Sequence, residues 1–441
     1  MTSDDSSFKA ATIASIRNPR VWLAPVVVVG LVMSLLAVLY LDSILDPQKN
    51  LHDFPIAVVN QDEGENVVAP DGTTQRQTFG DQIVQGLVDG IPKDKVDLRQ
   101  VGIAEEQTLL RKGEIYGSIV IPSDFSKRLL ILAQASVVDG DVEKPVITVK
   151  TNPRAGTFAI SIATTIYDQA MEQVNTTVGK QLTEQVIAQL NAGPTPTPIS
   201  GASRLVLAEP IQIETAQYNP LPAGSGNGLA AFYYALLLLL AGFTGAMIVS
   251  SLVDAQLGFA PAEFGPWYIY NPSVHVSRFH TLVVKWVIMI VVGIVVSGLY
   301  LGISTFLDMP VTRPATLFAY GAFAIAAVGI TATSIMAAFG TAGLVINLIL
   351  FIILGVPSSG GTVPLEGQPP FFAWLANFEP LHQVFIGVRA ILYYDARYDS
   401  GLLHAFWMTV FGLITGLVVG TVATRVYDRK GFHRKADDVT A

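Results

Sequence analysis

Long apolar segments and one long polar stretch alternate along the chain, and this pattern predicts a membrane protein with a folded outer domain. Residues 22–41 and 228–253 are predominantly apolar and carry no charged side chain. Each is close to the roughly 20 residues that an α-helix needs to cross the hydrocarbon layer. The polar stretch between them, residues 43–227, is therefore predicted to fold on one side of the membrane, held at both ends by spanning helices.

Four further apolar segments follow the polar stretch, at about residues 282–307, 315–339, 344–356 and 402–424. With the first two they predict an α-helical polytopic membrane protein of six spans, one before and five after the outer domain. The predicted division of the chain is an N-terminal segment (1–21), a first span (22–42), the outer domain (43–227), spans two to six with an interrupted stretch at about 357–394 (228–424), and a basic tail (425–441).

The charges that flank the spans predict the orientation of the chain. Lys9, Arg17 and Arg20 precede the first span, and a second group of cations follows the last one: Arg425, Arg429, Lys430, Arg434 and Lys435. Because short flanks rich in lysine and arginine stay in the cytoplasm, both ends of the chain are predicted inside. We therefore expect a multi-pass protein of the bacterial plasma membrane with residues 43–227 outside. Two cytoplasmic ends agree with an even number of spans.

The outer domain has the pattern of a mixed α/β fold. Short apolar runs that end at turn residues predict strands at Phe54–Val59, Tyr116–Ile121 and Val146–Lys150. Apolar side chains that recur every four positions predict a long helix over residues 157–190. Shorter helices are expected at Phe79–Val88, at Ile103–Arg111 and around Ser126. This order of elements predicts a small sheet with helices on one face.

Composition excludes several classes of protein and site. The 441 residues are 51% hydrophobic and 14% charged, and without a basic stripe no nucleic-acid partner is expected. The absence of cysteine excludes disulfides and thiolate metal sites. The sequence has no GxxxxGK(S/T), HExxH or GxSxG motif, so we expect no enzyme activity and no catalytic, cofactor or metal site in this chain. Any ATP hydrolysis would belong to a separate subunit.

The predicted spans carry few ionisable groups. No Asp, Glu or Arg lies in the middle of a span, and Lys285 is near enough to the inner end for its amine to reach the headgroups. Proton-driven carriers need ionisable residues at membrane depth, so the pattern disfavours a proton-coupled carrier. Asn347 is the strongly polar group deep in the fifth span. It is expected to hydrogen-bond a neighbouring helix, with a substrate contact as the alternative.

Small residues on the last span predict close helix packing. Gly412, Gly416 and Gly420 follow GxxxGxxxG spacing, which lets another helix approach closely. The motif fits packing within one subunit as well as packing between two.

The connection between the fifth and sixth spans has an unusual composition for an outer loop. It is rich in glycine and proline around Pro364, then aromatic at Phe371, Phe372 and Trp374, and its last apolar part surrounds Arg389. Each apolar part is too short to span a bilayer. The pattern predicts a re-entrant segment, because broken backbone is tolerated at membrane depth where protein or a wet cavity surrounds it. The alternative is a loop whose aromatic rings lie at the headgroup level.

Three parts of the chain carry a family resemblance. They are Pro55–Gly64 (PIAVVNQDEG), Gly117–Ser126 (GSIVIPSDFS) and the stretch from Ser359 through Pro364 to Arg389. With one anchor, an outer domain and five further spans, the chain resembles the six-span permeases of type-2 ABC exporters. Its outer domain resembles the YhgE/Pip branch of that group, and the chain is also similar to nitrosoguanidine-resistance-like membrane proteins.

The resemblance implies partners and site residues. It implies a homodimer in the lipid bilayer, powered by a separate nucleotide-binding ATPase that contacts the inner loop at Phe264, Trp267, Tyr268 and Tyr270. It implies a substrate path or gate near Asn347, Pro364, Phe371, Phe372, Trp374 and Arg389. Arg389 would meet an anionic headgroup, or it would pair with Glu379 or a helix end.

Two functions remain open from the sequence. The first is an ABC-type export permease that moves an amphipathic, lipid-like or drug-like substrate out of the cell. The alternative is an envelope receptor or scaffold whose outer domain binds a wall component, a protein or a phage.

Overall fold

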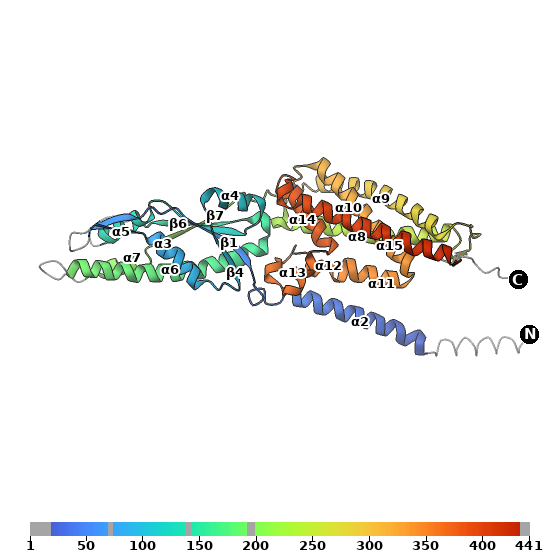
Figure 1. The fold of residues 1–441 in the computed structure, drawn as a ribbon, viewed down its shortest axis with the longest axis horizontal. Helices are drawn as coiled ribbons and strands as arrows, with labels where there is room; N and C mark the ends of the chain where they lie inside the picture. The colour runs from blue at the N-terminus through green and yellow to red at the C-terminus, as the bar shows by residue number, and fades with distance from the viewer. Residues whose placement is uncertain (1–18, 69–73, 137–142, 192–198, 433–441) are drawn as a thin grey trace, which may run out of the picture.

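The computed structural model describes residues 19–68, 74–136, 143–191 and 199–432. They form an elongated molecule with an α/β body at one end and a bundle of long helices at the other (Figure 1). Helix α2 (Pro19–Ile44) leads from the bundle side into the α/β body, and the chain returns to the bundle through α8 (Leu229–Gln256).

A five-stranded sheet with the order β4-β1-β5-β6-β7 forms the centre of the α/β body. The strands are β1 (Phe54–Asn60), β4 (Val96–Gln100), β5 (Gly117–Ile121), β6 (Val146–Thr151) and β7 (Gln212–Gln217). Strand β1 is parallel to both neighbours, whereas β6 is antiparallel to β5 and parallel to β7. A separate hairpin joins β2 (Glu65–Val68) and β3 (Thr74–Gln77). The three predicted strands are β1, β5 and β6, and the sequence pattern missed the other four.

Helices cover both faces of the sheet, which corrects the expectation of helices on one face. One face packs against α3 (Phe79–Gly90), α5 (Phe125–Ala135) and the long α6 (Thr157–Asn191), which α7 (Gly201–Ala208) joins from outside. The other face packs against α4 (Ile103–Lys112), and Figure 1 shows α4 and α6 on opposite sides. Because strand side chains alternate between faces, Ile56 and Val58 face α6 whereas Ala57 meets Leu110 of α4.

One carboxylate, that of Asp62, caps two helices of the α/β body. Its oxygens accept hydrogen bonds from Gly80 N in the first turn of α3 and from Ser126 N in the first turn of α5, both at 2.9 Å. Ser126 Oγ donates to Asp62 at 2.5 Å and accepts from Phe79 N at 2.8 Å. Neither helix is capped by the side chain at its own N-cap position. These first-turn amides therefore depend on Asp62 and Ser126 for partners.

Five helices in the described part of the chain are long and apolar enough to cross a membrane, so the chain is a multi-pass membrane protein. They are Pro25–Ile44 within α2, Gly226–Gln256 around α8, α9 (Arg278–Phe306), α10 (Pro314–Phe339) and α15 (Leu402–Arg429). The remaining predicted span, at 344–356, lies in a shorter apolar helix, Ala342–Ser358. It consists of α11 (Ala342–Leu348), a π-helical turn (Ile349–Ile353) and α12 (Gly355–Ser358). The predicted fifth span, and with it the count of six, therefore stays a prediction.

Helix α10 lies at the centre of the bundle, where it packs against α8, α9 and α15. Glycines make the approach of α15 possible, because a Cβ at Gly416 would collide with Thr331 and one at Gly420 with Ser334 of α10. The Cβ position of Gly412 is open. Two of the three glycines in the GxxxGxxxG motif thus serve packing within one subunit.

Lys285 pairs with an acidic side chain inside the bundle, and the expectation that its amine reaches the headgroups stays a prediction. It is 5% exposed, and its Nζ forms an ion pair at 2.8 Å with Asp254 Oδ1 near the end of α8. A buried amine is costly unless an acid accompanies it, so the partner on α8 accounts for the inward position. The pair also joins α9 to α8.

Residues 355–395, which we call the broken segment, fold back against the bundle. After α12 come the irregular residues 359–364, a 3₁₀ turn (Leu365–Gly367), α13 (Pro370–Ala376) and α14 (Pro380–Tyr393). Helix α14 packs against α8, α10 and α15. Parts of the broken segment are buried, since Ser358, Ser359 and Gln368 are at most 1% exposed. Broken backbone at membrane depth needs protein around it, and the re-entrant position of this segment stays a prediction.

Candidate functional site

The broken segment meets the α/β body at a small cavity that we call the junction cavity. Arg154 and Thr157 line it from the α/β body, Gly228 lines it at the start of α8, and Pro364 and Arg389 line it from the broken segment. Its volume is about 30 Å³. A cavity of this size holds a water molecule but no amphiphile. The structure is therefore closed at this point.

Two guanidinium groups face the junction cavity without a carboxylate partner among the described residues. Arg389 Nη1 donates to the carbonyl oxygen of Ala155 at 3.3 Å, and its buried Nε has no described hydrogen-bond partner. Arg154 Nη1 donates to the carbonyl oxygen of Tyr393 at 2.5 Å, and Nε donates to that of Asn219 at 2.9 Å. Backbone carbonyls leave the positive charges uncancelled. A carboxylate or phosphate would pair with these groups if the junction cavity widened.

Glu379 is not the partner of Arg389, which corrects one of the two sequence-based alternatives. The Glu379 carboxylate accepts hydrogen bonds from Leu381 N and His382 N, both at 2.8 Å, and so caps α14. It is 2% exposed. The arginine side chain instead lies near the rings of Phe385 and Tyr394, at 5.5 and 6.0 Å from their centroids.

Glu366 connects the broken segment to the α/β body beside this cavity. Its Oε2 accepts a hydrogen bond from the Tyr116 hydroxyl at 2.8 Å, and its carbonyl oxygen accepts one from His52 N at 2.8 Å. Burial raises the pKa of Tyr116 well above its usual range, and the Glu366 carboxylate raises it further. The phenol therefore remains a hydrogen-bond donor to Glu366 across the physiological pH range.

The aromatic residues of α13 lie apart from the two arginines. Phe371 and Trp374 are exposed at the surface, whereas Phe372 is buried. The ring of Trp374 packs edge-on against Phe378 at 4.7 Å between centroids. Exposed aromatic rings of this kind are typical of the membrane–water interface. The structure thus brings Pro364 and Arg389 together at the cavity and places Phe371 and Trp374 on the outside.

Asn347 lies in α11 and faces α10, away from the junction cavity. It is fully buried, and its Nδ2 donates to the carbonyl oxygen of Ala332 at 3.0 Å. This is the helix–helix hydrogen bond expected from its position in an apolar segment.

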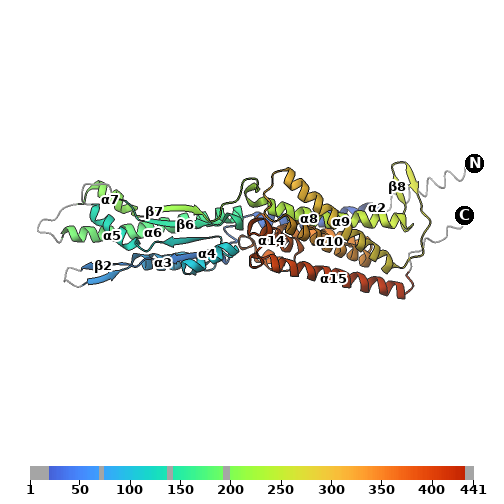
Figure 2. The ribbon, with the colours of Figure 1, turned by 90° about the horizontal axis from the view of Figure 1, so that it is seen from above.

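The predicted ATPase-contact loop is a β-hairpin, β8 (Ala262–Phe264) with β9 (Trp267–Ile269). It projects from the end of the bundle opposite the α/β body (Figure 2). Trp267 is 70% exposed, and Tyr268 and Tyr270 are similarly open. The side chain of Phe264 lies outside the described part of the structure. Exposed aromatic side chains on a projecting hairpin are the kind that anchors protein interfaces.

Helix α8 joins the hairpin to the junction cavity. It begins at Leu229, which lines the cavity together with Gly228, and it ends shortly before β8. At its start Phe232 fills the space where a side chain on Gly361 would lie, so α8 and the broken segment interlock. One continuous helix thus runs from the hairpin to the cavity.

Arg154 and Glu366 were not predicted as site residues from the sequence. Arg154 sits in a short 3₁₀ turn before α6 and Glu366 in another within the broken segment. Each was one charged residue in a stretch rich in proline and glycine, and no spacing linked it to Arg389. The contacts that define the site join residues more than 200 positions apart.

Comparisons with known proteins place the chain in a family. The model of the family described as "Protein of unknown function (DUF3533)" matches residues 25–412. No curated protein matches the chain. A crystal structure of a domain assigned to an ABC type-2 transporter of Thermotoga maritima MSB8 is similar at 16% identity, over 41% of this chain and 98% of that one, with a TM-score of 0.24.

Proposed function

This chain belongs to the DUF3533 family, and we propose that it is the permease subunit of an ABC-type exporter. Its substrate would be an amphipathic, lipid-like or drug-like molecule that moves out of the cell. The observation that carries the proposal is the pairing of two features at the ends of α8. One is a closed cavity with two arginines beneath the α/β body, and the other is an exposed aromatic hairpin.

The proposal assigns a role to each end of the bundle. A separate nucleotide-binding subunit binds the hairpin on the cytoplasmic side, and α8 transmits its movement to the junction cavity. Arg389 and Arg154 then receive the anionic part of the substrate as the cavity opens toward the α/β body. The proposal also includes a homodimer, both chain termini in the cytoplasm, the α/β body outside the cell, and membership of the YhgE/Pip branch.

Replacing both Trp267 and Tyr268 with alanine is expected to remove the ATPase partner. Truncation of an aromatic anchor at the centre of an interface costs about 2 kcal/mol or more, which corresponds to roughly 30-fold in affinity. The measurement is purification of the tagged full-length protein from its own host in mild detergent, followed by mass spectrometry and an ATP hydrolysis assay of the complex.

Tyr398 provides the matched control, because it is 74% exposed and lies beyond α14 at the other end of the bundle. The Tyr398→Ala protein should retain the nucleotide-binding subunit and its ATP hydrolysis. Recovery of a wall component or envelope protein through the α/β body, with no nucleotide-binding subunit in the wild-type sample, would instead support a receptor or scaffold.

A further inference from the structure

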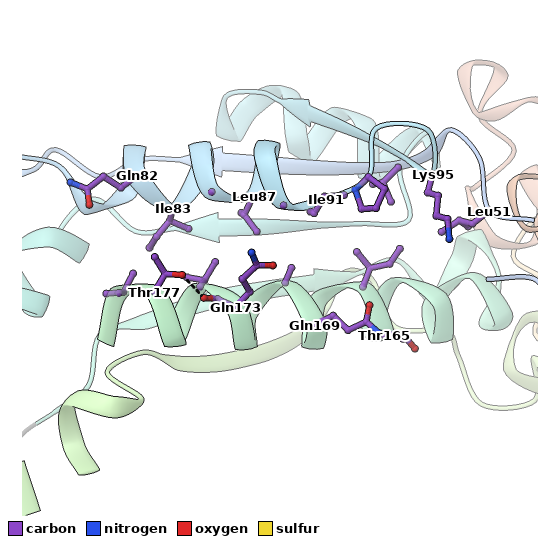
Figure 3. A pocket seen from close by; sticks show the side chains of 18 of the residues that line it. Leu51, Gln82, Ile83, Leu87, Ile91, Lys95, Thr165, Gln169, Gln173 and Thr177 are labelled. Carbon is purple, nitrogen blue, oxygen red and sulfur yellow. Dashed lines mark hydrogen bonds between the residues drawn. The ribbon is translucent and has the colours of Figure 1, made fainter. Parts of the chain in front are cut away.

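A second and much larger cavity lies in the α/β body, between α3 and α6 (Figure 3). Its volume is about 510 Å³, which lies in the range of small-molecule sites. We call it the α3–α6 groove. It is far larger than the junction cavity and shares no residue with it.

The groove has an apolar floor and amide-rich sides. Ile83 and Leu87 project into it from α3, and Gln169 and Gln173 project from α6 (Figure 3). Ile83 and Leu87 are only 2% exposed, so the floor belongs to the core of the α/β body. Glutamine side chains at the rim can turn to water or to an occupant. This composition suits a long apolar chain with water along its upper side.

Gly86 of α3 lines the groove and leaves space in it, because glycine has no side chain. No atom lies within 4 Å of the position that a Cβ would take on Gly86, although the residue is in the middle of α3. At such a position glycine makes a helix less stable than alanine or leucine would. The open volume of the groove depends on this missing side chain.

One charge lines the groove, and it lies at one end. Lys95 is the single charged residue among those described as lining it, and its Nζ approaches the carbonyl oxygen of Gln48 at 3.4 Å. Gln48 and Leu51 line the same end, and they follow shortly after α2 leaves the bundle. The end of the groove that carries Lys95 thus lies close to the C-terminal end of α2, a predicted spanning helix.

We infer that the α3–α6 groove binds an anionic amphiphile with a single long apolar chain. The anionic head pairs with Lys95 near the membrane surface, and the chain lies along the apolar floor between the two helices. The charge complementarity at one end and the continuity with α2 favour an occupant that comes from the bilayer. The inference goes beyond the proposed export, because it assigns a binding site whether or not the occupant is the exported substrate.

The test is photolabelling of the full-length protein in phosphatidylcholine nanodiscs with palmitic acid that carries a diazirine near its chain end. Mass spectrometry should locate the label on groove residues of α3 and α6. Gly86→Leu should lower this labelling roughly tenfold or more, because leucine fills the volume that the chain occupies. Leucine also favours the helix, so a loss would not come from unfolding of α3. Gly201→Leu adds the same side chain at another open position of the α/β body and should leave labelling unchanged.

A second comparison tests the head group. Wild-type protein should prefer the fatty acid over the matching diazirine alcohol, and Lys95→Gln should remove this preference while Lys93→Gln retains it. Label confined to the membrane helices overturns the inference, as does groove labelling that Gly86→Leu leaves unchanged. A peptide bound in the groove that palmitic acid fails to displace would also overturn it. Because no ATPase is present, the result does not depend on the proposed function.

Discussion

Replacement of Asp62 with alanine is expected to destabilise the α/β body by about 2–4 kcal/mol. The estimate follows from the loss of two helix caps at about 1 kcal/mol each and of a charge-assisted hydrogen bond to Ser126. The buried strands β1 and β5 should then exchange their amide hydrogens roughly 30- to 700-fold faster, because those amides open through unfolding of the body. Hydrogen exchange of the full-length protein in nanodiscs measures this directly, and peptides from the helical bundle serve as the internal reference.

Asp124 provides the control carboxylate for this experiment. It lies two residues from Ser126 at the N-cap position of α5, yet its side chain makes no cap hydrogen bond. It pairs at 2.6 Å with Arg128 on the surface, and an exposed pair of this kind contributes about 0–1 kcal/mol. Asp124→Ala should leave the exchange of β1 and β5 nearly unchanged. Equal effects of the two substitutions would show that Asp62 has no special role.

Replacement of both Arg389 and Pro364, by glutamine and alanine, is expected to abolish export while the protein still inserts and folds. Loss of one charged partner from a buried ionic contact costs about 2–5 kcal/mol, so transport of an anionic amphiphile should fall roughly 30-fold or more. The measurement is ATP-driven movement of a fluorescent phosphatidylglycerol in liposomes that contain the protein and its co-purified ATPase subunit. Arg389→Lys should retain part of the activity, because it keeps the charge and loses the planar fork.

Arg397→Gln is the matched control for this export test. Arg397 is exposed and pairs with Asp399, two residues away, so its loss should affect neither fold nor transport. Unchanged export with Arg389 and Pro364 both replaced would show that the junction cavity is not a gate. An intact hydrogen-exchange pattern of β1 and β5 in the same sample separates a transport defect from misfolding.

The elements that could be predicted from the sequence are those with a clear apolar pattern in their own residues. Strands β1, β5 and β6 are apolar runs, and α6 buries a stripe at a spacing of about four residues. Strand β7 (QIETAQ) has no such signal, because all six of its residues are exposed. It forms a strand because it pairs with the edge strand β6, and that edge exists only once the sheet has folded.

Pairings between distant residues account for what the sequence left open. The pieces Pro55–Gly64 and Gly117–Ser126 stood out separately, and the structure joins them through Asp62 and Ser126. In the same way, nothing in the sequence indicated that Lys285 of α9 pairs with Asp254 of α8. Periodicity reports which face of an element is apolar, but it contains no information on which partner that face will meet.

The position of β7 has a consequence for the synthesis of this protein. It is the last strand of the sheet, and the chain passes from it almost directly into α8. In the proposed orientation the whole α/β body must therefore cross the membrane while α2 is the sole anchor of the nascent chain. The sheet gains its final strand just as α8 leaves the ribosome, so completion of the α/β body and insertion of the second span coincide. Until then β6 presents an open edge, and a chain stalled before residue 212 would expose it to aggregation.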